Sequence, residues 1–158
     1  MSRLNLDITL SHKKIDFPKN SVKVFKDMKT KAQKTTVAFE ELLEAAREES
    51  WQFVDENISE SYLTEKYIRW ALTEGLFDAD PNIRDLAATI LNMSDTPLNP
   101  PDIKTLEAVL EDDPYHIVRF RVAIALYKRK RQTPLVLRVM EQAKSDPDVG
   151  ELVRRYFI

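Results

Sequence analysis

The stretch "DADPNIRDLAATIL", residues 78–91, contains the Asp-Pro pair that decides the fold. The same pair occurs at residues 80/81, 113/114 and 146/147, so the interval between successive pairs is 33 residues both times. Asp suits the N-cap of a helix because its carboxylate accepts hydrogen bonds from free backbone N–H groups. Pro suits the first helical position, where no donor is needed. A constant interval of this length predicts an array of structural repeats.

Apolar residues follow each pair at the spacing of one helix face. The first and third copies share the same offsets, and the middle copy matches with a two-residue insertion. The matching residues are Ile83, Leu86, Ala87, Ile90 and Leu91; Val118, Val122, Ala125 and Leu126; and Val149, Leu152, Val153, Tyr156 and Phe157. A second helical run precedes each copy, at residues 61–74, 100–111 and 134–144, and Tyr67 and Trp70 fall on the packing face of the first run. Asn99 and Thr133 are predicted to cap the runs that begin at Pro100 and Pro134. The repeating unit is therefore predicted to be a helix hairpin.

These hairpins resemble HEAT repeats, in particular the HEAT-like type related to phycobilisome-lyase repeats. The resemblance is carried by Asp80, Ile83, Arg84, Ala87 and Leu91 in the first copy, and by Asp113, Val118, Arg119 and Leu126 in the second. It implies an all-α, right-handed α-solenoid of about three hairpins with a helical N-terminal cap. It also implies that turn Asp and second-helix Arg residues form a ladder between repeats. Gly150 stands where the third copy would have its Arg.

The chain is predicted to be a single domain, residues 1–158, of which residues 59–158 form the three hairpins. Residues 1–58 are expected to supply an arm and capping helices. "LNLDITL", residues 4–10, alternates apolar and polar positions, as an extended strand does. Two interpretations of this strand stay open: it lies on the helices of its own chain, or it adds to a partner's sheet.

Charge is distributed in blocks along the chain. Residues 1–36 carry +6, residues 37–80 carry −9, residues 81–126 carry −3 and residues 127–158 carry +4, which sums to the net charge of −2. Four lysines, Lys23, Lys26, Lys31 and Lys34, fall on one side of a predicted N-terminal helix. A second basic run comprises Lys128, Arg129, Lys130 and Arg131. Solvated helix faces and helix-dipole pairing explain such runs. The functional alternative for both runs is nucleic-acid binding, and for the N-terminal helix also binding to an anionic membrane surface.

The concave face offers a sharper candidate for binding. In a HEAT array the second helices line that face, which would place Phe120, Ile124 and Tyr127 at its centre and Arg154 and Arg155 at its border. An aromatic centre with a charged rim is typical of interface hot spots. The alternative is that these residues are buried by the chain itself.

Chemistry-bearing motifs are missing from the sequence. It has no Cys, two well-separated histidines at positions 12 and 116, and no Gly-rich phosphate loop, so no metal site, cofactor or catalytic residue is predicted. No apolar run is long enough to span a bilayer, and a cytoplasmic location is expected. The predicted function is a non-enzymatic protein–protein interaction module whose concave face binds a peptide or partner protein. Nucleic-acid binding is the alternative, and the resemblance alone adds a lyase or chaperone role toward a tetrapyrrole protein.

Overall fold

The computed structural model describes residues 35–157, and all regular structure in that range is helical. The all-α class is therefore confirmed for this part of the chain. The helices are α2 (Phe39–Arg47), α3 (Trp51–Asn57), α4 (Glu65–Thr73), α5 (Pro81–Met93), α6 (Pro100–Asp112), α7 (His116–Lys128), α8 (Pro134–Ala143) and α9 (Gly150–Arg154), with 3₁₀ turns η2 (Glu60–Tyr62) and η3 (Gly75–Phe77). The predicted strand at residues 4–10 lies outside the described residues.

The three Asp residues of the repeated pair make the same local hydrogen bond. Asp80, Asp113 and Asp146 each accept from the backbone N–H two residues further on, at 2.9, 2.8 and 2.8 Å. Helix α5 accordingly begins at Pro81. The other two copies differ from the predicted start, because α7 begins at His116 and α9 begins only at Gly150. Helix α9 also ends at Arg154, short of the apolar stripe predicted for it.

Two further helices begin at capped prolines, as the sequence predicts. The Asn99 side chain accepts from the Asp102 N–H at 2.9 Å ahead of α6, and the Thr133 hydroxyl accepts from the Val136 N–H at 3.3 Å ahead of α8. These caps satisfy donors that helix geometry leaves without a partner. The helix starts after residues 80, 99 and 133 are therefore local properties of the sequence.

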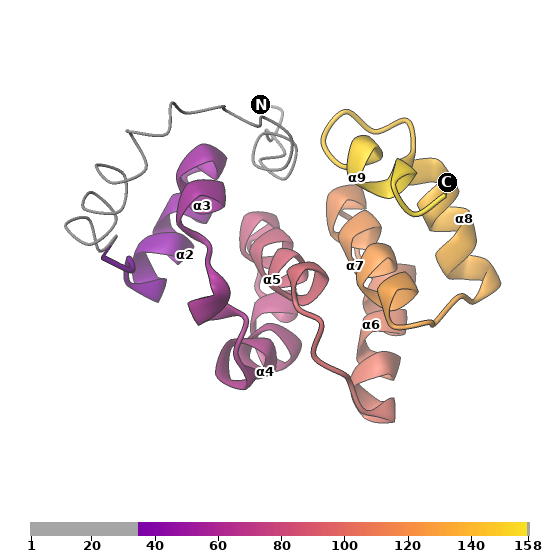
Figure 1. Cartoon of the computed structure of the whole chain (residues 1–158), viewed down its shortest axis with the longest axis horizontal. Helices are drawn as coiled ribbons and strands as arrows, with labels where there is room; N and C mark the ends of the chain where they lie inside the picture. Colours follow the sequence, from indigo (N-terminus) through magenta and orange to yellow (C-terminus); the bar gives the residue numbers. More distant parts are fainter. Residues whose placement is uncertain (1–34, 158) are drawn as a thin grey trace, which may run out of the picture.

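The helix pairs α2/α3, α4/α5 and α6/α7 follow one another along the long axis of the molecule, and α8 lies beyond α7 (Figure 1). Helix α5 packs against α4, α2 and α7, and α7 in turn packs against α6 and α8. Their contacts form one core with fully buried side chains such as Leu86, Leu91 and Leu126. Within residues 35–157, no helix is both long and apolar enough to cross a membrane.

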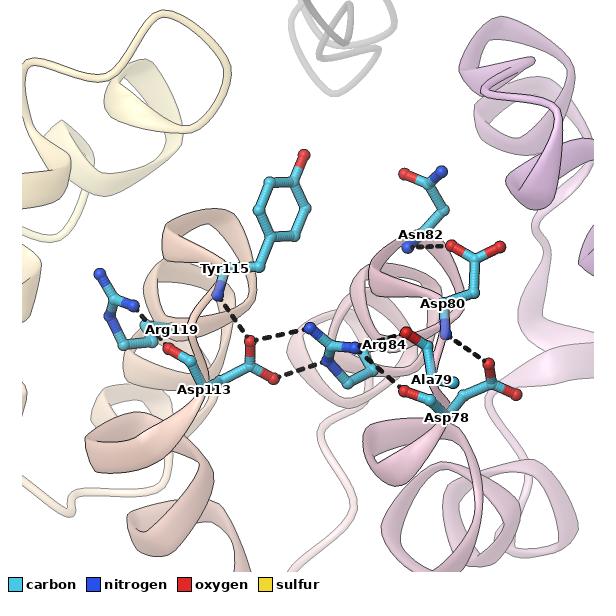
Figure 2. Close-up of polar contacts among 8 residues, drawn as sticks. All are labelled: Asp78, Ala79, Asp80, Asn82, Arg84, Asp113, Tyr115 and Arg119. Carbon is cyan, nitrogen blue, oxygen red and sulfur yellow. Dashed lines mark hydrogen bonds and ion pairs between the residues drawn. The ribbon is translucent and has the colours of Figure 1, made fainter.

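Side-chain hydrogen bonds and ion pairs, here called rungs, connect neighbouring helix pairs. Arg84 donates from Nε to the Asp113 carboxylate at 2.8 Å and also donates to the carbonyls of Asp78 and Ala79 (Figure 2). Arg119 instead donates to the carbonyl of Asp113 in the loop that precedes its own helix. The rung that reaches Asp146 comes from His116, whose Nε2 lies 3.7 Å from the carboxylate. An Asp–Arg contact is thus present between the first two copies, whereas the side chain near Asp146 is His116 and not an arginine.

Two further ion pairs join helices of different hairpins. Arg69 of α4 makes a bidentate pair with Asp102 of α6, at 2.8 and 2.9 Å. Arg121 of α7 lies 2.6 Å from Asp85 of α5, and both side chains are 4% exposed. A buried pair of this kind is costly to break because the remaining charge has no compensation.

Candidate functional site

The apolar patch expected at the centre of α7 is not an open surface. Phe120 is 8% exposed and Ile124 is fully buried, while Tyr127 is half-buried. Helix α7, "HIVRFRVAIALYK", has apolar residues on all sides, a pattern typical of a helix enclosed by its neighbours. The prediction that Phe120 and Ile124 face an open groove is therefore wrong. Phe120 and Ile124 are instead buried by the chain itself, as the alternative interpretation predicted.

The expected charged rim lies at the C-terminal end of the molecule. Arg154 and Arg155 are exposed, and Arg154 donates to the carbonyl of Lys144. The Tyr127 ring contacts the rings of Tyr156 and Phe157, with centroids 5.8 and 6.0 Å away. The two arginines therefore border an aromatic contact that belongs to the chain's own C-terminal end.

Arg129, in the middle of the basic run, is a structural residue. Its guanidinium donates to four backbone carbonyls at 3.0–3.1 Å, and burial lowers its pKa. The carbonyls belong to Leu91, Ser94, Thr96 and Ala125. Three of them lie at or just beyond the C-terminal end of α5, where helical carbonyls lack intrahelical partners. Arg129 therefore caps α5 from the end of α7.

Two other residues of this basic run also make contacts within the chain. Lys128 donates to the carbonyl of Asn92 at 2.6 Å and lies 3.2 Å from the Asp95 carboxylate. Arg131 pairs with Glu107 at 2.6 Å. Lys130 is exposed. The lysines of the nucleic-acid alternative at positions 23, 26, 31 and 34 lie outside the described residues, so that alternative stays a prediction.

A different site lies between α2, η2 and α4. Four aromatic rings, those of Phe39, Tyr62, Tyr67 and Trp70, line a surface pocket of about 470 Å³ together with Glu40 and Lys66. We call this the aromatic pocket. Tyr62 is buried, whereas Phe39, Tyr67 and Trp70 are half-buried and keep part of their surface open. The rings thus join the core on one side and the pocket on the other.

The rings hold one another in place. The Phe39 centroid lies 4.6 Å from that of Tyr67 and 4.8 Å from that of Trp70, where the two planes meet at 83°. Tyr62 and Tyr67 meet edge to face at 5.1 Å. Such tilted contacts follow the quadrupoles of the rings and fix their orientation. A rigid aromatic surface loses little side-chain entropy when a ligand covers it.

Local sequence explains how the pocket is built. Tyr67 and Trp70 are three residues apart on α4, so they point to one side of the helix. Phe39 opens α2, whose start is fixed by Glu41, because its carboxylate accepts from the Ala38 N–H at 3.3 Å. Gly75 leaves room for the indole ring of Trp70, because a Cβ added at this position would lie 2.8 Å from the ring.

Two charged side chains line the pocket, the carboxylate of Glu40 and the ammonium of Lys66. Glu40 is exposed and lines the pocket, and it makes no hydrogen bond or ion pair within residues 35–157. Burial raises the pKa of the Tyr62 hydroxyl, and the charges of Tyr67, Glu41 and Glu40 raise it further. The Lys66 ammonium lies 5.2 Å from the Tyr67 centroid, which is within the range of a cation–π contact.

Sequence reasoning places Tyr67 and Trp70 on a packing face but does not find the aromatic pocket. A signal was available, since Phe39, Tyr62, Tyr67 and Trp70 gather in residues 39–70 in front of the first Asp-Pro pair. Among the residues that the structure describes, no group of three or more His, Asp or Glu side chains is arranged to hold a metal ion. No protein-family model, curated protein or solved structure matches this chain.

Proposed function

We propose that this chain is a non-enzymatic protein-interaction module, a HEAT-like α-solenoid that binds a peptide segment of a partner. The binding surface in this proposal is the aromatic pocket, in place of the buried centre of α7. Repeat arrays present extended surfaces that suit peptide binding. The order of the helix pairs and the rungs between them support the solenoid part of the proposal.

One observation carries the choice of surface. Phe39, Tyr67 and Trp70 pack against one another yet remain partly open in a pocket beside the exposed carboxylate of Glu40. Half-open aromatic side chains on a rigid support are the groups that contribute most at protein interfaces. A pocket of about 470 Å³ has room for one or two side chains of a bound peptide.

A peptide-display screen tests this proposal. The full chain is expected to select a family of peptides, and Tyr67→Ala is expected to weaken their binding about 10-fold or more, as loss of a hot-spot contact does. The matched control is Phe157→Ala, which removes a ring that is 37% exposed at the opposite end of the chain. Circular dichroism would verify that both variants stay folded. Selection of no peptide, or equal weakening by both substitutions, would reject the aromatic pocket as a binding site.

A further inference from the structure

We infer that the aromatic pocket takes the side chain of an arginine in a basic peptide, an inference that rests on the proposed function and names its ligand. The occupant stacks its planar cation on the rings of Phe39, Tyr67 and Trp70 and pairs with the carboxylate of Glu40. Four observations support this inference: the rings, the position of Lys66, the charge around the pocket and the carboxylate of Glu40.

The rings present the surface that a guanidinium prefers. Arginine is planar and weakly hydrated, so it stacks on aromatic faces at a smaller cost of desolvation than an ammonium. The half-open surfaces of Phe39, Tyr67 and Trp70 come from two different helices, α2 and α4, and meet in the same pocket. An arginine side chain laid across them covers aromatic surface along its whole length, because its methylene stem is apolar.

Lys66 places a cation near one of these rings. Its ammonium lies 5.2 Å from the Tyr67 centroid rather than against a carboxylate, although glutamates are plentiful nearby. Lys66 is exposed and lies on a flexible stem, so a ligand can displace it from the ring. The ring face of Tyr67 is therefore open to a cation at cation–π distance.

Charge around the pocket favours a basic partner over an acidic one. Residues 37–80, which contain the whole pocket except Thr36, carry −9, so the rest of the chain carries −2 − (−9) = +7. The exposed carboxylates of Glu40, Glu41, Glu60 and Glu65 lie on the elements that form the pocket. Such a concentration of one sign steers an oppositely charged peptide toward the site and repels an acidic one.

Glu40 supplies the specific contact. Its carboxylate is free of partners within the described part of the chain, unlike Glu41, which caps α2, and Glu44, which lies 3.6 Å from Arg47. A carboxylate accepts two parallel hydrogen bonds from a guanidinium, and this geometry distinguishes arginine from lysine. The pocket is therefore expected to prefer arginine when the total charge of the peptide is the same.

Fluorescence anisotropy with defined peptides tests the inference. The probes are a labelled Gly/Ser peptide that contains several arginines, the same peptide with lysines, and the same peptide with citrullines, which keep the shape and lose the charge. The arginine peptide is expected to bind the full chain about 10-fold more tightly than the citrulline peptide and several-fold more tightly than the lysine peptide. Glu40→Gln is expected to reduce this preference, whereas Glu151→Gln, an exposed control on α9, is expected to leave it unchanged.

Several outcomes would overturn the inference. Equal binding of the arginine and citrulline peptides, or equal effects of Glu40→Gln and Glu151→Gln, would exclude a guanidinium contact. If uncharged peptides from the display screen still bound in a Tyr67-dependent way, the proposed function would survive and only the basic ligand would be lost. Carbodiimide crosslinking identifies another occupant. Glu40 could become crosslinked to a lysine of residues 1–34 or to a second copy of the chain. If the arginine peptide failed to suppress that crosslink, the crosslinked segment, and not a partner peptide, would be the occupant of the pocket.

Discussion

At the scale of single residues, Arg129 is the clearest case of a side chain whose role depends on distant backbone. The sequence shows it inside the run "KRKR", where helix-dipole pairing and phosphate binding are both reasonable interpretations. The four carbonyls that it contacts come from residues 91–96 and from residue 125. No local sequence pattern predicts that these carbonyls lie together around the Arg129 guanidinium. The run was predictable as basic, and its use as a cap for α5 was not.

Replacement of Arg129 by alanine should therefore destabilise the fold. Four carbonyls would lose a charged donor in a half-buried position, and we expect the free energy of unfolding to fall by about 2–4 kcal/mol. Urea denaturation measures this change. Arg131→Ala is the matched control, because its pair with Glu107 is half-exposed and should contribute less than about 1 kcal/mol. Similar losses in both variants would refute the capping role.

Ile124 tests the revised position of the α7 residues. It is fully buried, so Ile124→Ala should remove about 2–5 kcal/mol of stability through lost burial and the cavity left behind. Leu137→Ala removes a side chain that is 40% exposed on α8 and should cost much less. Thermal unfolding of the two variants provides the comparison. A stable Ile124→Ala protein with impaired peptide binding would restore the concave patch as the functional surface.

At the scale of helices, the start signals were predictable and the exposure of a helix face was not. Asp80, Asn99 and Thr133 cap helices as expected because a cap and a following Pro act within a few residues. The burial of α7 depends on α5, α6 and α8 together. The HEAT-like pattern predicts that one face of α7 is exposed, but these three helices pack around it. The aromatic pocket likewise needs α2 and α4 to meet, which spacing along the chain does not specify.

The end of α7 predicts a stabilising substitution. Lys130 has φ 64°, a left-handed conformation that is strained for a residue with a Cβ, and the Arg131 N–H donates back to the carbonyl of Leu126. Lys130→Gly should raise the free energy of unfolding by about 1 kcal/mol because glycine adopts this conformation without strain. Lys104→Gly, inside α6, should lower it by about 1 kcal/mol. Thermal denaturation of both variants measures these changes. Destabilisation by Lys130→Gly would contradict the inference that Lys130 is strained in its left-handed conformation.

At the scale of the whole molecule, ion pairs between hairpins make the packing sensitive to acid. The hydrogen bond from Arg69 lowers the pKa of Asp102, whereas the same carboxyl in the unfolded chain titrates near its ordinary value of about 3.9. A lowered pKa in the folded state adds stability above the unfolded pKa, and this stability is lost as pH falls through the folded pKa.

Asp102→Asn should therefore destabilise the protein at neutral pH, and its difference from wild type should shrink as pH falls from about 4 through the lower pKa that Asp102 has in the folded state. The measurement is the midpoint of urea unfolding at a series of pH values. Asp112→Asn, an exposed neighbour on α6, is the control and should leave the wild-type pH profile unchanged. A constant difference between Asp102→Asn and wild type at all pH values would exclude this linkage.

The most direct test of the central claim, that the aromatic pocket binds a peptide, is a ¹H–¹⁵N NMR titration of the full chain with a peptide chosen by display. The signals of the Trp70 indole N–H and of the backbone amides of α2 and α4 are expected to shift and saturate as the peptide is added. The amides of α8 and α9, at the far end of the molecule, should remain in place (Figure 1). Saturating shifts centred on α7 to α9, with the Trp70 signal unmoved, would contradict the claim.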